Sequence, residues 1–139
     1  MTTRAGRAIL VCAGEPSGDL HGAAVVTALR KRYPGVRLEG CGGPRMADAG
    51  LEVLTGIDRL SAMGFLEVVG AIPRHAALLR RLVGQGRAGR YRLAVLIDYP
   101  GFHLRLGAAL RRAGVPVLIY IAPQLWAWRP GRMPRLRKA

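Results

Sequence analysis

Residues 8–13 read AILVCA and run directly into GEPSGD at residues 14–19, and this junction is the strongest structural signal in the chain. Six consecutive apolar residues ended by a glycine predict a short strand buried on both faces, as in a parallel sheet. Residues 19–33 then carry apolar side chains at helical spacing until Pro34-Gly35 stops them. A further strand at residues 36–40 would complete a βαβ unit, whose crossover is almost always right-handed.

The remaining sequence continues this alternation of strands and helices. Pro44 favours a helix start, because its missing N–H would be unpaired there anyway. We expect a helix at 44–49, a strand at 51–54, an unusually apolar stretch at 63–69, a helix at 73–87, a strand at 93–97, a helix at 102–113 and a strand at 117–121. This order predicts an α/β fold with a doubly wound, mostly parallel sheet.

The composition bounds the class of protein. The chain has 139 residues, 22 Lys and Arg against 8 Asp and Glu, a formal net charge of +14 and two cysteines. That length suits one compact domain, half apolar content excludes intrinsic disorder, and only two cysteines exclude a disulfide scaffold. Apolar stretches are too short to span a bilayer, so a cytoplasmic protein is expected. The basic charge suits anionic partners such as phosphate, lipid headgroups or nucleic acid, or else reflects solvated helix faces.

The loop at residues 14–19 lies where nucleotide-binding fingerprints occur, yet it matches none of them. A phosphate-binding loop needs Lys where Asp19 stands, and a dinucleotide-binding loop needs Gly where Pro16 stands. Glu15, Ser17 and Asp19 could instead bind sugar hydroxyls. The alternative is that Asp19 or Ser17 only caps the following helix.

Asp98 follows an apolar strand and precedes Tyr99-Pro100, so a carboxylate is expected at a strand tip beside a rigid turn. A partly desolvated carboxylate there can take a proton from a hydroxyl group. The alternative is again a helix cap.

The only two tryptophans, Trp126 and Trp128, lie close together and precede Arg129. They could form a platform for a sugar or a lipid headgroup, or they could be core residues. The three histidines and two cysteines show no metal-ligand spacing, so no metal is predicted, and Cys12 and Cys41 are expected to be buried packing residues.

Taken together, the motifs resemble the lipid-A-disaccharide synthase family over nearly the whole chain. Five of them occur in that family's order: AGEPSGDLHG at 13–22, GCGGPRM at 40–46, MGFLEV at 63–68, IDYPGF at 97–102 and APQLWAWR at 122–129. Each motif is weak alone, but five in register are highly specific. The chain departs from the family pattern at Gly101, where an acidic residue is expected, at His103, where Asn is expected, and at Ala122, where Ser is usual.

The resemblance implies an inverting glycosyltransferase of the GT-B type, with two Rossmann-like domains. It would pass 2,3-diacylglucosamine from UDP to 2,3-diacylglucosamine 1-phosphate, without metal or cofactor, at the cytoplasmic face of the inner membrane. Residues 1–128 would be the N-terminal, acceptor-side domain and 129–139 a basic, truncated tail, with the donor-binding domain absent and the chain inactive alone. A homo-oligomer is a further possibility.

The resemblance also assigns roles to individual residues. Asp98 is expected to be the catalytic base or to position the acceptor hydroxyl. Residues expected to bind acceptor or substrate are Glu15, Ser17, Asp19, Gly43, Met63, Gly64, Gln124, Trp126 and Arg129. Phe65, Leu66 and Val69 are expected to face acyl chains or an anionic membrane surface, unless they belong to an ordinary helix packed on the sheet.

Two other functions compete with this interpretation. One is a different GT-B enzyme or a nucleotide-sugar epimerase, against which the acidic first loop argues. The other is a noncatalytic basic module that binds nucleic acid. Such a module interleaves aromatic with basic residues on one surface, and the sparse aromatics do not form that pattern, so no nucleic-acid partner is expected.

Overall fold

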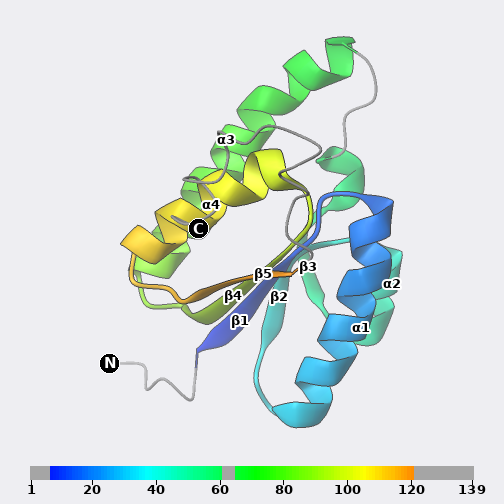
Figure 1. Cartoon of the computed structure of the whole chain (residues 1–139), viewed down its shortest axis with the longest axis vertical. Coiled ribbons are helices and arrows are strands. Elements are labelled where there is room, and N and C mark those ends of the chain that lie inside the picture. The colour runs from blue at the N-terminus through cyan, green and yellow to red at the C-terminus, as the bar shows by residue number, and fades with distance from the viewer. Residues whose placement is uncertain (1–6, 61–64, 121–139) are drawn as a thin grey trace, which may run out of the picture.

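The computed structural model describes residues 7–60 and 65–120, with only the backbone for residues 65–72. Strands and helices alternate along this part of the chain (Figure 1). In chain order they are β1 (Ala8–Cys12), α1 (Pro16–Arg32), β2 (Leu38–Gly42), α2 (Pro44–Ala49), β3 (Glu52–Gly56), the 3-10 turn η2 (Ile57–Arg59), α3 (Phe65–Arg87), β4 (Tyr91–Ile97), α4 (Pro100–Arg112) and β5 (Val117–Tyr120).

The five strands form one sheet in the order β3-β2-β1-β4-β5, and every neighbouring pair is parallel. This is a Rossmann-like arrangement, and it confirms the predicted α/β fold. The chain reverses its direction of travel across the sheet between β1 and β4. Loops at the carboxyl ends of these two strands therefore flank the topological switch point, where open α/β sheets bind their ligands.

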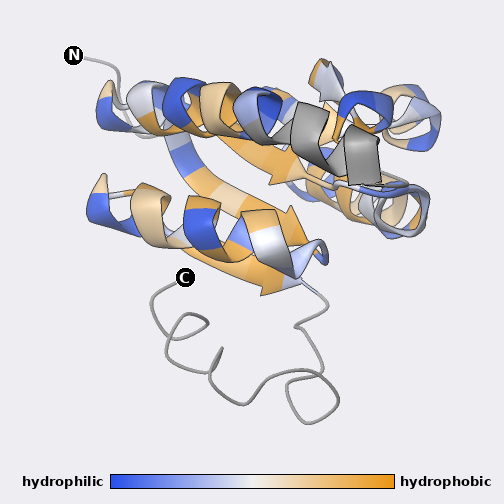
Figure 2. Cartoon of the chain, turned by 90° about the horizontal axis from the view of Figure 1, so that it is seen from above, coloured by the Kyte–Doolittle hydropathy of each residue, from blue (hydrophilic) through white to orange (hydrophobic). Residues whose placement is uncertain are grey.

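Helices cover both faces of the sheet, α1 and α2 on one side and α3 and α4 on the other (Figure 1). Strand β1 is buried along its whole length, and its side chains alternate between the two layers. Leu10 packs with Leu82 and Leu106, whereas Val11 packs with Val26 and Met46. The strands are accordingly mostly hydrophobic in Figure 2, which explains why residues 8–13 are apolar without interruption.

Several boundaries differ from those expected. Helix α1 begins at Pro16 rather than at Asp19, because a proline suits the first helical turn. Strand β2 runs through Gly42, and Gly40 lets the backbones approach where a Cβ would overlap the Val11 carbonyl. Helix α3 begins at Phe65 and continues through Pro73, so the apolar stretch and the predicted helix are one element.

The amino-terminal edge of the sheet is held by a buried ion pair. Glu39 of β2 is fully buried, and Arg90 donates to both of its carboxylate oxygens at 2.5 and 2.6 Å. These hydrogen bonds lower the pKa of Glu39. The pair joins the chain just before β4 to β2, across the intervening β1.

Two further predictions are tested by the described residues. Cys12 and Cys41 are unpaired and buried at neighbouring positions of β1 and β2, which confirms their role in packing. In residues 7–60 and 65–120, none of the helices has the length and apolar character needed to cross a membrane.

Candidate functional site

The turn after β1 presents one part of the candidate site at the carboxyl edge of the sheet. Glu15 occupies the N-cap position of α1, but its side chain makes no capping hydrogen bond. Glu15 and Ser17 are both exposed, whereas Asp19 is buried. The N-cap and first turn of α1 therefore offer two polar side chains to solvent and keep the second carboxylate inside the protein.

The carboxylate of Asp19 is held by the loop that follows β2. It accepts hydrogen bonds from the backbone N–H groups of Gly43 at 2.9 Å, Arg45 at 3.1 Å and Met46 at 2.9 Å. It thus caps α2, not its own helix, and the expectation that Asp19 or Ser17 caps α1 is wrong. A Cβ at Gly43 would lie 2.5 Å from Asp19 Oδ2, so this contact requires glycine.

The turn after β4 is built from two residues in the left-handed region. Asp98 and Tyr99 have φ values of 48° and 51°, a conformation that costs about 1–2 kcal/mol for each non-glycine residue. The N–H of Asp98 donates to the Tyr120 carbonyl at 3.0 Å, and the N–H of His103 donates to the Tyr99 carbonyl at 3.1 Å. Tyr99, not Asp98, occupies the N-cap position of α4, and no side chain caps it.

His103 fixes this turn from within the core. Its ring is almost fully buried, and Nδ1 lies 2.6 Å from the Asp98 carbonyl oxygen. Because a carbonyl only accepts, Nδ1 carries the proton. Burial lowers the pKa of His103 to about 4, so the ring is neutral at pH 7. In the described part of the chain, no hydrogen bond holds the Asp98 side chain, which is half-buried at the strand tip.

Tyr99 joins the two turns. Its ring lies so close to Gly14 that a Cβ there would overlap it. The Tyr99 hydroxyl donates to the Leu60 carbonyl at 2.6 Å and lies 3.1 Å from Nε2 of His75. Burial and the negative charge of Glu15 raise the pKa of Tyr99, which places Glu15 within electrostatic reach of this ring. The structure therefore brings Glu15 and the Asp98–Tyr99 turn together.

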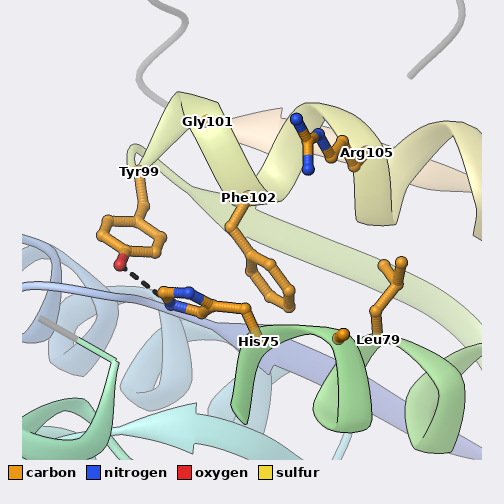
Figure 3. Close-up of a pocket in the computed structure, with 7 residues that line it drawn as sticks. His75, Leu79, Tyr99, Gly101, Phe102 and Arg105 are labelled. Atoms are coloured by element: carbon orange, nitrogen blue, oxygen red, sulfur yellow. Dashed lines mark hydrogen bonds between the residues drawn. The ribbon is translucent and has the colours of Figure 1, made fainter. Parts of the chain in front are cut away.

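A pocket of about 380 Å³ opens between α3 and α4, directly beyond this turn (Figure 3). His75 and Leu79 line it from α3, and Gly101, Phe102 and Arg105 line it from α4. Tyr99 forms its inner end, where the dashed line in Figure 3 marks the contact with His75. Its volume falls within the range of about 300–1,000 Å³ that is usual for small-molecule sites.

The other predicted site residues are placed as follows. Met63, Gly64, Gln124, Trp126 and Arg129 lie outside the described residues. Phe65, Leu66 and Val69 lie in the first turns of α3, where only the backbone is described, so their orientation stays a prediction. Within the described residues, no three His, Cys, Asp or Glu side chains are grouped as metal ligands.

Sequence reasoning did not select Tyr99, His75 or Arg105 as site residues. Tyr99 stands inside a quoted motif, but its contacts with Gly14 and Leu60 join positions that are 85 and 39 residues away. His75 and Arg105 lie in amphipathic helices, where nothing in the helical spacing marks them. The sequence marks His103 only as a departure from the family pattern, and its contact with the Asp98 carbonyl is seen in the structure.

Comparison with known proteins supports the resemblance. Residues 9–139 match the family model described as lipid-A-disaccharide synthetase. Curated lipid-A-disaccharide synthases from Anaeromyxobacter sp. (strain K) and Solibacter usitatus are 44% and 45% identical over 130 residues, which are 94% of this chain and 34% of each relative. The enzyme from Coxiella burnetii (strain Dugway 5J108-111) is 41% identical over 134 residues, 95% of this chain and 35% of the relative. The chain spans about a third of the length of these relatives, and it belongs to the lipid-A-disaccharide synthetase family of glycosyltransferases.

Proposed function

We propose that this chain forms the acceptor side of an inverting glycosyltransferase of the GT-B type. The reaction transfers 2,3-diacylglucosamine from its UDP carrier to the 6-hydroxyl of 2,3-diacylglucosamine 1-phosphate, giving a β-1,6-linked disaccharide and UDP. The family match supports the reaction class. The main support for the site is Asp98, which is half-buried at the switch point. No described residue forms a hydrogen bond with its carboxylate.

Asp98 acts as the general base in this proposal. Its carboxylate takes the proton of the acceptor 6-hydroxyl while that oxygen bonds to the anomeric carbon of the donor sugar. The bond from that carbon to the UDP oxygen breaks on the opposite face, so the configuration inverts. One carboxylate suffices because no covalent intermediate forms. The hydrogen bonds around Asp98 and Tyr99 hold the turn, so little reorganisation is needed.

The remaining residues are proposed to bind and orient. The side chains of Glu15 and Ser17 are exposed, and the charge of Glu15 acts on Tyr99, the neighbour of Asp98, so both are proposed to bind sugar hydroxyls. Asp19 and Gly43 support this edge, because their mutual contact fixes the loop after β2. We keep Met63, Gly64, Gln124, Trp126 and Arg129 as substrate-binding candidates, the last as a partner for phosphate.

A membrane surface is proposed as the place of reaction, because both substrates carry acyl chains. Phe65, Leu66 and Val69 at the start of α3 would enter the interface while nearby arginines meet anionic lipid. Replacing these three residues by serine should release folded protein from anionic vesicles in a sedimentation assay. Unchanged sedimentation would make them core residues.

We further propose that residues 1–128 form the acceptor domain and that residues 1–139 alone do not catalyse transfer. The matched relatives are about three times as long, and GT-B enzymes close two domains around their substrates. The decisive experiment grafts this chain in place of the matched 130 residues of the Anaeromyxobacter enzyme. The chimaera should release UDP when given both substrates, whereas residues 1–139 should not. A silent chimaera that is folded, or turnover by residues 1–139, would contradict this assignment.

A further inference from the structure

The pocket between α3 and α4 is lined largely by apolar side chains among the described residues. Leu79 and Phe102 contribute apolar side chains from opposite sides (Figure 3). At the inner end, the Tyr99 hydroxyl is engaged by the Leu60 carbonyl and faces His75. Burial lowers the pKa of His75, so its ring is uncharged at neutral pH. Between the two helices the described walls therefore offer mainly hydrocarbon contact, and Arg105 is the charged member of the described lining.

Among the described residues that line the pocket, the cation is Arg105. Arg105 is exposed, and no described residue forms an ion pair with it. Gly101 stands four residues earlier, on the same face of α4, and a Cβ at Gly101 would meet nothing within 4 Å. In the described part of the chain, nothing fills the space at Gly101 and nothing neutralises the guanidinium group of Arg105.

The distances along α4 relate Arg105 to the proposed catalytic turn. Arg105 lies five residues after Pro100, the first residue of α4, which corresponds to about 7 Å along the helix axis. This rise along the helix axis is comparable to the length of a single hexose. Apolar walls, this cation and this spacing describe an amphiphile with an anionic headgroup.

We propose that this pocket holds one fatty acyl chain of the acceptor and that Arg105 binds its phosphate. The identity of the amphiphile as 2,3-diacylglucosamine 1-phosphate rests on the proposed function. The apolar pocket and its arginine are features of the structure itself. In this arrangement the acyl chain lies between α3 and α4, the phosphate meets Arg105, and the sugar lies over the turn with its 6-hydroxyl toward Asp98. The pocket then selects acceptors that carry both a fatty acyl chain and a phosphate group.

The test uses soluble probes and the 139-residue chain. Octyl phosphate should bind measurably by calorimetry, more tightly than octyl glucoside, which lacks the charge, and glucosamine 1-phosphate, which lacks the chain. Gly101→Leu fills the pocket from α4 and should weaken octyl phosphate binding at least about tenfold. Ala76→Leu fills it from α3 and covers the case in which the first variant misfolds.

Two further variants distinguish the contribution of the alkyl chain of the probe from that of its phosphate charge. Arg105→Gln should weaken octyl phosphate by about tenfold and leave octyl glucoside unchanged. Gly84→Leu is the matched control, because Gly84 also lies in a helix with open space around its Cβ but away from the pocket. Folding of each variant is checked by circular dichroism. Octyl phosphate binding that both filling variants retain, or that the wild-type chain lacks, would overturn the proposal.

The same variants distinguish this proposal from the proposed function. In the chimaera, Gly101→Leu should raise the KM for the acceptor. Normal acceptor kinetics with Gly101→Leu would refute the proposed role of the pocket and would not affect the proposed reaction. If octyl phosphate binding depends on the pocket but the folded chimaera is inactive, the proposed reaction would be refuted and the proposed role of the pocket would stand.

Discussion

The segments that follow β1 and β4 flank the same switch point, and each carries an aspartate, Asp19 in the first turn of α1 and Asp98 in the turn before α4, yet the two carboxylates are used in opposite ways. Asp19 is buried and accepts three backbone hydrogen bonds from the start of α2. Asp98 is half-buried, and within the described residues it is the Asp98 carbonyl, not the carboxylate, that is held by a side chain, His103. Similar sequence patterns at a strand end thus produce one structural acid and one available acid.

The largest effect should follow from removing the available acid. Asp98→Asn in the chimaera should lower turnover at least about a hundredfold, because the amide cannot accept the hydroxyl proton. Asparagine tolerates the left-handed conformation of this position, so the turn should persist. Steady-state UDP release measures the effect, with Asp48→Asn on the exposed side of α2 as the control. Near-normal turnover would make both aspartates structural.

Removing the structural acid should instead affect folding. Asp19→Ala leaves the N–H groups of Gly43 and Met46 without their acceptor and should lower the free energy of unfolding by about 3–5 kcal/mol. Urea denaturation of the 139-residue chain measures the loss. Asp48→Ala, at an exposed position of the same small helix, should change stability by less than about 0.5 kcal/mol. Equal stability of the two variants would refute the capping role.

The histidine beneath the second turn should make stability depend on pH. Burial lowers the pKa of His103 from 6.5 to about 4, so between these values the unfolded chain binds a proton that the folded chain does not. The free energy of unfolding should therefore decrease as the pH falls through this window, by up to about 3 kcal/mol in total. His103→Asn should remove this component, as seen by thermal or urea denaturation at several pH values. Identical pH profiles would show that the pKa of His103 does not change on folding.

The smallest effect should come from the contact that joins the two turns. Gly14→Ala forces the Tyr99 ring away from the first turn and should cost about 1–3 kcal/mol of stability. Gly84→Ala serves as the control, because a methyl group there meets open space in α3 and should be neutral or stabilising. If Gly14→Ala is also neutral, the two turns are independent.

The fold was predictable because each of its steps is local. The apolar run at residues 8–13 and the stop at Pro34-Gly35 mark one βαβ unit, and the α/β alternation determines the sheet type. The start of α3 differs from the expected one because Pro73, a residue that usually ends or breaks a helix, lies inside it. Helix α1 starts three residues before the expected position because Pro16 is its first residue.

The candidate site was only partly predictable, since its contacts join distant segments. Their positions after strands are enough to select Asp98 and Asp19 as candidates. Nothing in the local sequence shows that the Asp19 carboxylate is bound by a loop 24 residues later, whereas that of Asp98 is available to a substrate. The pocket needs α3 and α4 side by side, and no helical pattern predicts that His75 faces Tyr99. Local sequence thus indicates where chemistry is possible, and tertiary contacts determine which residues perform it.

The central place of β1 has a consequence for how the chain folds during synthesis. One edge of β1 pairs with β2, about 30 residues later, but its other edge waits for β4, more than 80 residues later. The β1-α1-β2-α2-β3 half can therefore form first. Until Ile97 has left the ribosome, one backbone edge of β1 is unpaired and half of the core is uncovered. An uncovered edge of this kind is open to pairing with another chain. The interval between the emergence of β2 and that of β4 is accordingly the period in which this protein is most exposed to aggregation and most dependent on chaperones.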